Sequence, residues 1–301
     1  MIRPRPNPVA SQAMAISDAQ LAEFTARGYV TIDSPFTPAQ LRAAIETLDA
    51  ITVHDPNQGF EEEGPDGRMR PTGNHRSHPN LRGGLSRAEN FSQALLDLIQ
   101  HPWQEQVARR VLRSSDIVLT NGVSVYSYPE PEPPEAYTFH IDEKATREEM
   151  AATPFRRTAS LWLWLTDVTP DTGPLMVHPG SHLTLADARQ REPWPWPEGQ
   201  GMPAHKLPPG LLELLEPAEP ILARAGQVTL FNYATLHSAS YVKSRTRVRK
   251  VWLTQFVRGL PPDVLATLGT PLTRGAGMCR GTAPPPASPT GRRRRGTLGC
   301  G

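Results

Sequence analysis

Two residues that could bind a metal ion lie close together in the segment YTFHIDEKAT, residues 137–146. They are His140 and Asp142, and the apolar Ile141 lies between them. In a β-strand, residues two positions apart point to the same side. The imidazole and the carboxylate could therefore reach one ion while Ile141 packs on the opposite face. By themselves they fit an ordinary strand end with two surface polar side chains better than a metal site.

A third candidate ligand, His237, ends the glycine-led apolar run GQVTLFNYATLH. It lies 97 positions after His140, which leaves room for several strands between them. Two imidazoles and one carboxylate form the ligand set of a non-haem Fe(II) oxygenase, with the opposite face open for a cosubstrate and O2. The two cysteines, Cys279 and Cys300, lie near the C-terminus. They are too few for a disulfide framework or a cysteine-based zinc site.

Arginines stand at the beginning of the next β-like run, SRTRVRKVWLTQF, residues 244–256. Arg247 and Arg249 share one face of the expected strand with Val251. A guanidinium is planar and can bind both oxygens of a carboxylate. A buried arginine is costly unless it is paired, and a bound dicarboxylate would pair it. The run therefore supplies a candidate anchor for an anionic cosubstrate.

The N-terminal part of the chain carries helix signals. Ser17 and Gln20 form a capping box ahead of an apolar-periodic segment, and Gly28 fits the position after its end. Thr37 and Pro38 begin a second helix by the same logic. Further helical patterns occupy residues 87–100 and 102–112.

The following part is rich in β signals. Its apolar and β-branched runs are DIVLTNGVSVYSY, TASLWLWLTDV, PLMVHPG, GQVTLFNY and RVRKVWLTQFV. Helices followed by a set of strands predict an α+β fold that is mainly β, with the strands in a sandwich or a barrel. Trp162 and Trp164 share one strand face and are interpreted as core. His178 and His182 flank Pro-Gly-Ser and are interpreted as surface histidines of a turn.

We expect one folded domain, residues 17–262, between a flexible N-terminus, residues 1–16, and a disordered basic tail, residues 275–301. Two segments without clear periodicity, 54–86 and 187–210, are candidate lid loops. The tail carries five arginines and no acidic residue. Since the whole chain has a net charge of +2, the remainder carries about −3.

The chain of 301 residues is long enough to bury a sizeable core. It shows no signal-peptide pattern and no apolar run of about 18 residues. We therefore expect a soluble, cytoplasmic protein without membrane association. The arginine run 292–295 has no folded binding motif beside it, so we expect a solvated tail and no nucleic-acid partner. The oligomeric state is left open.

The longer motifs resemble those of the phytanoyl-CoA dioxygenase family of Fe(II)/2-oxoglutarate-dependent oxygenases. The resemblance covers about residues 17–256 and is carried by LAEFTARGYVTIDSPFTPAQLRAAIETLD, WLWLTDVTPDTGPLMVHPGSH, GQVTLFNYATLH and RKVWLTQF. The stretch from Asp167 to His182 is the most characteristic part. The resemblance implies a double-stranded β-helix, of jelly-roll or cupin-like type, with N-terminal helices packed on one sheet.

The resemblance also implies roles for single residues. The iron ligands would be His140, Asp142 and His237. Arg249 would hold 2-oxoglutarate, with Arg247 on the same face as the alternative. Asn121 falls where the family often has an amide that helps to hold this cosubstrate.

Two positions refine the resemblance. After the second histidine ligand the family often shows His-x-Ser, whereas this chain has alanine at position 239, so one cosubstrate hydrogen bond is in doubt. At the carboxylate position the chain has Asp142. Related halogenases leave that position open for chloride, so Asp142 favours oxygen transfer.

The expected function is oxidation of a small molecule, with secondary metabolites as one candidate class. The default outcome is hydroxylation of an unactivated C–H bond with release of succinate and CO2, and O2 is the second cosubstrate. Desaturation, cyclisation and epimerisation use the same ligand set and are not distinguished. Two rivals are a cupin-like metal enzyme that does not consume 2-oxoglutarate and a non-catalytic cupin-like binding protein.

Overall fold

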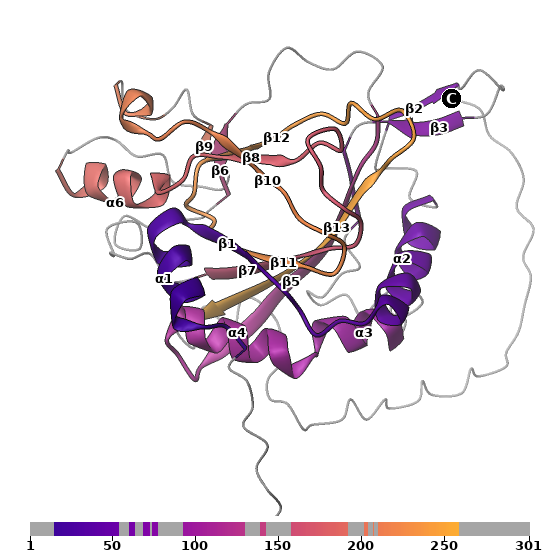
Figure 1. Cartoon of the computed structure of the whole chain (residues 1–301), viewed down its shortest axis with the longest axis horizontal. Helices are drawn as coiled ribbons and strands as arrows, with labels where there is room; N and C mark the ends of the chain where they lie inside the picture. The colour runs from indigo at the N-terminus through magenta and orange to yellow at the C-terminus, as the bar shows by residue number, and fades with distance from the viewer. Residues whose placement is uncertain are drawn as a thin grey trace, which may run out of the picture.

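The computed structural model describes residues 15–53, 60–63, 69–72, 74–77, 93–129, 139–142, 158–191, 202–203, 207 and 210–258. Within these ranges the protein consists of two stacked antiparallel sheets, and helices cover the outer face of the larger sheet (Figure 1). The predicted mainly β fold with N-terminal helices on one sheet is confirmed. The described strands form a two-sheet arrangement and do not close into a barrel.

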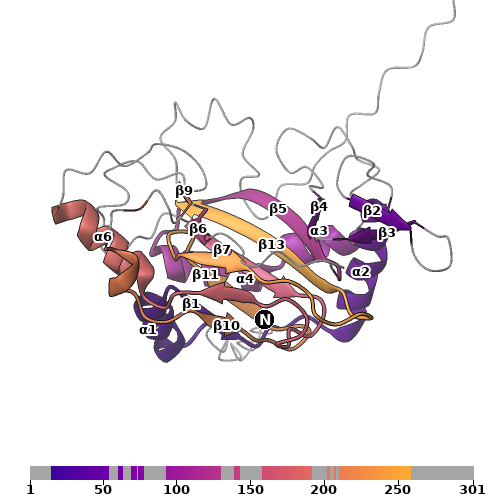
Figure 2. The same ribbon diagram turned by 90° about the horizontal axis from the view of Figure 1, so that it is seen from above.

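The larger sheet has six strands, all antiparallel to their neighbours. In spatial order they are β1 (Tyr29–Ile32), β11 (Val228–Phe231), β7 (Thr158–Trp164), β13 (Arg249–Arg258), β5 (Ile117–Ser127) and β4 (Asn74–Ser77). The long strands β5 and β13 run side by side along the molecule (Figure 2). Sequence neighbours are rarely sheet neighbours here, so distant motifs are brought together.

The smaller sheet has five short strands. In spatial order they are β10 (Glu219–Ile221), β8 (Leu175–Val177), β12 (His237–Ala239), β6 (His140–Ile141) and β9 (Met202–Pro203). A separate hairpin consists of β2 (Phe60–Glu63) and β3 (Met69–Thr72). His140 and His237 lie on strands β6 and β12 of the smaller sheet, and Asp142 directly follows β6.

Alternation along β7 separates two hydrophobic clusters. Trp162 and Trp164 point into the space between the sheets and pack with Val177 of the smaller sheet. Leu161 and Leu163 point the other way and pack under the helices. Both faces of the strand are buried, which explains the near-continuous apolar run in its sequence. The core interpretation of the two tryptophans agrees with this placement.

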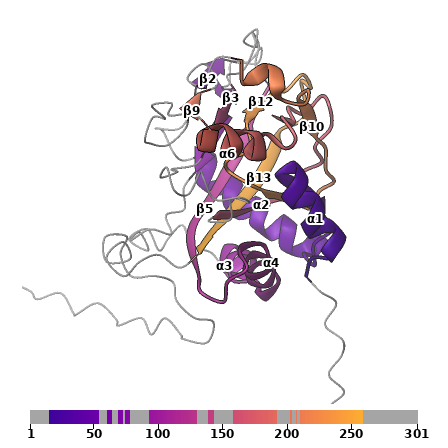
Figure 3. The same ribbon diagram turned by 90° about the vertical axis from the view of Figure 1, so that its left-hand side faces the viewer.

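The described helices are α1 (Asp18–Arg27), α2 (Pro38–Val53), α3 (Gln93–Ile99), α4 (Pro102–Leu112) and α6 (Ser181–Arg191), with a 3-10 turn η3 (Leu212–Leu214). Helices α1, α2 and α4 begin where the sequence signals place them, and α3 lies inside the expected range 87–100. Helix α6 was not expected, because its beginning was interpreted as a turn with surface histidines. Ser17 and Gln20 form the reciprocal capping box of α1, and Gly28 follows that helix with φ 82°. Thr37 and Gln40 form the same pair of bonds ahead of α2. Helices α3 and α4 lie on one side of the molecule and α6 on the other (Figure 3).

The two segments expected to be loops contain short strands. In the range 54–86, β4 adds an edge to the larger sheet, with Asn74 opposite Ser127. In the range 187–210, α6 continues to Arg191 and β9 pairs with β6. Four-residue or shorter strands that rely on a distant partner leave little periodic signal in sequence. The hairpin of β2 and β3 also lies in the first segment, and residues 207 and 210 of the second are described. The rest of both segments, the tail and residues 1–14 lie outside the described residues.

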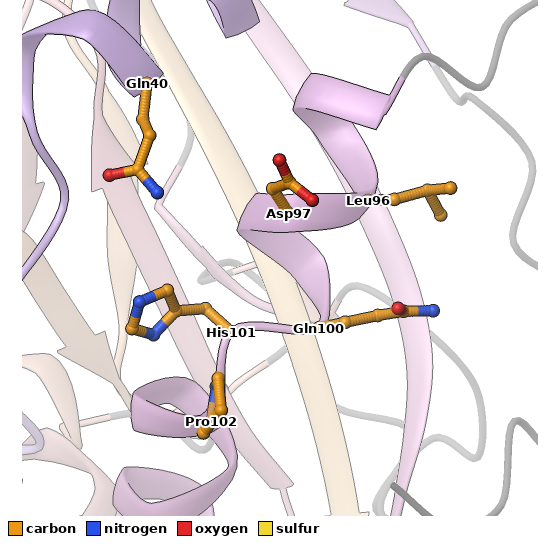
Figure 4. Close-up of a pocket in the computed structure, with 6 residues that line it drawn as sticks. All are labelled: Gln40, Leu96, Asp97, Gln100, His101 and Pro102. Carbon is orange, nitrogen blue, oxygen red and sulfur yellow. The ribbon is translucent and has the colours of Figure 1, made fainter. Parts of the chain in front are cut away.

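A surface depression lies between α2, α3 and the start of α4. Its lining residues are Gln40, Leu96, Asp97, Gln100, His101 and Pro102 (Figure 4). Gln40 accepts a bond from the Thr37 N–H, and His101 accepts one from the Trp103 N–H. These polar groups are thus used to begin helices, and the depression lies in the helical layer, away from the smaller sheet. None of the described helices has the length and apolar character needed to cross a membrane.

Candidate metal centre

The fold brings His140, Asp142 and His237 together. Strands β6 and β12 are neighbours in the smaller sheet, and His140 lies directly opposite His237. Each residue offers one ligand atom, and the three atoms lie within 4.8 Å of one another. Ile141, between the first two, is buried in a separate cluster that includes Leu236. The predicted division of this short strand into a ligand face and a core face is therefore present.

The Asp142 carboxylate lies close to both imidazole rings. Oδ1 is 3.4 Å from His140 Nε2, and Oδ2 is 3.5 Å from His237 Nε2. Nitrogen and oxygen ligands bind divalent ions at about 2.0–2.2 Å, so two donors on one ion stand at most about 4.4 Å apart. Both separations fall within that limit. The donor set and the two carboxylate–imidazole separations therefore fit a single divalent ion of the kind that imidazole and carboxylate prefer.

The His237 ring is held in orientation by a hydrogen bond from Nδ1, the ring nitrogen that does not face Asp142. Its Nδ1 lies 2.9 Å from the Thr235 carbonyl oxygen and donates to it. The proton is then on Nδ1, so Nε2 keeps its lone pair for an ion. The rings of Phe231 and Trp162 pack against it with centroid distances of 4.8 Å and 6.4 Å. His237 is thus a buried, pre-oriented ligand.

The Asp142 backbone is also tied to the β11–β12 connection, since its N–H donates to the Tyr233 carbonyl oxygen at 3.0 Å. Burial raises the pKa of the Asp142 carboxyl, but the neighbouring imidazoles of His140 and His237 outweigh burial and hold the pKa well below the usual range. The group is an anion at neutral pH. Side-chain exposure is 31% for His140 and 33% for Asp142, against 3% for His237. One side of the cluster is therefore reachable from outside.

The two candidate arginines have different surroundings. Arg249 opens β13 and is only 4% exposed, and its guanidinium donates to the Gly173 carbonyl oxygen and, at 2.5 Å, to Ser127 Oγ. Arg247 precedes the strand and is exposed. Its backbone N–H bonds to Ser244 Oγ. A buried, oriented guanidinium suits a bound carboxylate better than a solvated one does.

Asn121 lies on β5, and its side chain is outside the described residues. Its backbone pairs with Gln255, six residues along β13 from Arg249. At about 3.3 Å per residue the two positions are about 20 Å apart. The β5 residue opposite Arg249 is Ser127. Sequence reasoning missed Ser127, because only the register of β5 against β13 identifies it.

A small hydrogen-bonded group lies on the inner face of the larger sheet near His237. Trp162 Nε1 donates to Ser160 Oγ at 2.7 Å, and Ser160 Oγ lies 3.1 Å from the Tyr233 hydroxyl. The Trp162 ring contacts His237. Trp162 is therefore both a core residue and a wall of the candidate site. The strand periodicity alone could not distinguish these two roles.

The interpretation of His182 as a surface residue was wrong. The side chain is 1% exposed, and Nε2 donates to the Thr25 carbonyl oxygen at 3.1 Å. Helix α6 begins at Ser181, directly after Pro-Gly, so His182 turns inward against the end of α1. His178 stays partly exposed and packs against the Phe139 ring. A turn pattern fixes the chain direction but not which side chain is covered.

Burial lowers the pKa of His182 to about 4, with the Thr25 bond opposing the shift. An unfolded histidine titrates near 6.5, so the unfolded state gains the proton first and stability falls as pH drops from about 6.5 to about 4. We expect His182→Gln, which keeps a donor near the Nε2 position, to reduce the loss of unfolding free energy between pH 7 and 5 by about 2 kcal/mol. Urea unfolding at both pH values measures it. Equal losses in both proteins would contradict the assignment.

Comparison with known proteins agrees with the family resemblance noted in the sequence. The family model of phytanoyl-CoA dioxygenase (PhyH) matches residues 24–251. A search of curated proteins gave no significant match. Among solved structures, EvdMO1 is similar with a TM-score of 0.55 and 18% identity. The match covers 80% of this chain and 50% of that one, so the chain spans about half the length of EvdMO1.

Two other solved structures match over nearly their whole length. SnoK, a non-haem α-ketoglutarate-dependent carbocyclase from nogalamycin biosynthesis, has a TM-score of 0.57 and 19% identity over 87% of this chain and 96% of that one. The epimerase SnoN, in complex with Fe3+, α-ketoglutarate and nogalamycin RO, has a TM-score of 0.55 and 17% identity over 86% and 94%. These likenesses show a shared fold. Because the family model spans most of the sequence, the chain belongs to the phytanoyl-CoA dioxygenase (PhyH) family.

Proposed function

We propose that this chain is an Fe(II)/2-oxoglutarate-dependent dioxygenase whose iron ligands are His140, Asp142 and His237. The observation that carries the proposal is the convergence of two imidazoles and one anionic carboxylate on one spot, from strands far apart in sequence, in a chain of this family. The chemistry supplied by bound iron is activation of O2, coupled to conversion of 2-oxoglutarate into succinate and CO2.

The protein's residues bind and orient the reactants. Asp142 contributes a negative charge that partly neutralises the ion, and His237 keeps Nε2 directed toward it. Arg249 anchors the far carboxylate of 2-oxoglutarate, and Ser127 holds the guanidinium in place. Trp162 and Phe231 shield the inner side of His237 from water. Positioning of this kind, rather than new covalent chemistry, is the protein's part in a cofactor enzyme.

The substrate is a small molecule, and hydroxylation of an unactivated C–H bond is the default outcome. Carbocyclisation and epimerisation are the activities of SnoK and SnoN, which share the fold. For this chain they remain alternatives within the same enzyme class. Secondary metabolites are the first substrates to screen. Localisation in the cytoplasm stays a prediction from the sequence.

A non-catalytic binding protein is the main rival outside the class. The partly exposed side of the cluster and the buried Arg249 favour the enzyme, since a binding protein needs neither an open metal face nor a carboxylate anchor. Release of succinate separates the two. We expect the protein with Fe(II), 2-oxoglutarate and O2 to form succinate, and the rate to rise with the right substrate.

The control is the same assay without Fe(II), and with His140→Ala in place of the native chain. Both should give background succinate. Succinate formed by His140→Ala at the native rate would contradict the proposal. A panel of candidate metabolites run in parallel then identifies the substrate by the increase in succinate and by mass change of the metabolite.

A further inference from the structure

Residues 232–236 connect β11 to β12 and lead directly into His237. This connection forms hydrogen bonds with groups that lie outside these two strands. The Leu236 N–H donates to Ser181 Oγ at 2.8 Å, and the Leu236 carbonyl accepts from the His178 N–H at 3.0 Å. The Asn232 N–H donates to the Gly28 carbonyl oxygen at 2.8 Å. Ser181 is the first residue of α6, Gly28 directly follows α1, and His178 directly follows β8. Two helices therefore fix the chain immediately before a proposed metal ligand.

Thr235 is the residue of this connection that touches the ligand itself. Its carbonyl oxygen accepts a hydrogen bond from the Nδ1–H of His237. Its side chain is completely buried, and its hydroxyl donates to the Gly28 carbonyl oxygen at 3.3 Å. Its N–H donates to the Asn232 carbonyl oxygen at 2.8 Å. Thr235, whose carbonyl orients the imidazole, is thus held by both its backbone N–H and its side-chain hydroxyl.

Gly28 allows this contact because it has no side chain. Its φ is +82°, and a Cβ built there would lie 2.1 Å from Thr235 Oγ1 and 2.7 Å from His182 Nδ1. The end of α1 must therefore approach Thr235 more closely than any other residue type permits. The Gly28 carbonyl oxygen accepts hydrogen bonds from two residues of the connection, Asn232 and Thr235. Helix α1, which carries none of the proposed ligands, is thereby joined to His237.

We propose that Thr235 is a positioning residue for His237, an inference that rests on His237 being a metal ligand. The hydroxyl bond to Gly28 holds the Thr235 carbonyl in line with Nδ1, and this carbonyl fixes the ring so that Nε2 faces the ion. Partners behind a metal-bound histidine typically account for about a 10- to 100-fold difference in metal affinity. Loss of the hydroxyl loosens the carbonyl and lets the ring turn.

The test is a titration of the full-length protein with Co(II) alone, followed by its visible d–d absorption. Thr235→Val keeps the shape of the side chain and removes the hydroxyl, and we expect about 10-fold weaker Co(II) binding and a changed spectrum. Thr235→Ser keeps the hydroxyl and should restore native affinity and spectrum. Thr235→Ala removes the hydroxyl with a smaller side chain and carries the same expectation if the valine variant does not fold.

Thr229→Val is the matched control. Thr229 is also fully buried, and its hydroxyl bonds to Thr31 and to Trp164 Nε1, not to the His237 connection. We expect this variant to lose thermal stability and keep native Co(II) affinity. Native Co(II) affinity in folded Thr235→Val or Thr235→Ala would overturn the positioning role. So would equal weakening in Thr229→Val, because the effect would then be a general loss of stability.

His237→Ala in the same titration separates this inference from the proposed metal site. Weak binding by His237→Ala together with tight binding by the native chain supports the ligand assignment. If the native chain and His237→Ala bind Co(II) equally, the metal site itself is wrong and Thr235 has nothing to position.

Discussion

Asp142→Ala should abolish iron binding and the iron-dependent formation of succinate. The substitution removes the anionic ligand that lies 3.4 Å and 3.5 Å from the two imidazoles, and leaves two neutral donors facing a dication. The loss of metal affinity should exceed about 10- to 100-fold, which is the typical effect of removing a hydrogen-bond partner of a metal-bound histidine. Iron content after anaerobic reconstitution and the rate of succinate release measure it.

Two further variants make this result specific. Asp142→Glu keeps the carboxylate on a longer side chain and should retain part of the iron. Asp187→Ala removes an exposed carboxylate that pairs with Arg191 on α6 and should leave iron content and turnover unchanged. Full iron occupancy and full turnover in Asp142→Ala would show that the cluster is a structural polar group and not a metal site.

Arg249→Ala should weaken 2-oxoglutarate binding far more than Arg247→Ala. Removing one partner of a buried, hydrogen-bonded charge pair costs about 2 kcal/mol or more, which corresponds to at least about 30-fold in affinity. Arg247 is exposed and precedes β13, so its loss should change little. The measurement is the 2-oxoglutarate concentration dependence of succinate release, with iron content checked in every variant.

Conservative changes around Arg249 sharpen the assignment. Arg249→Lys keeps the charge without the planar fork and should recover only part of the affinity. Ser127→Ala removes the hydroxyl that accepts from the guanidinium and should cause a smaller loss. A strong effect of Arg247→Ala with none from Arg249→Ala would mean that the anchor arginine has been placed on the wrong residue of this strand.

Features set by neighbouring residues were predictable from sequence. The capping boxes at Ser17 and Thr37 are present, because a cap needs only residues three positions apart. The shared orientation of His140 and Asp142 follows from strand geometry, and it is also present. His237 was singled out by the apolar run that it ends, and the family motifs then assigned it to the same ligand set as His140, which no local rule could do.

Features set by register and by distant packing were not predictable. Ser127 gains its place beside Arg249 only through the pairing of β5 with β13. His182 is buried because α1 ends against it at Gly28, more than 150 positions earlier in the chain. Strand β4 exists because β5 offers it an edge, and its own sequence is polar. In each case the deciding partner lies outside any window that a periodicity argument can use.

Anaerobic titration with Fe(II) and then 2-oxoglutarate tests the proposed site most directly, because 2-oxoglutarate that chelates protein-bound Fe(II) produces a visible charge-transfer absorption. We expect the native chain to show this absorption only when both components are present, Asp142→Ala to show none, and Arg249→Ala to require much more 2-oxoglutarate. Absence of the absorption in the native chain, or an unchanged absorption in Asp142→Ala, would contradict an iron and 2-oxoglutarate site at His140, Asp142 and His237.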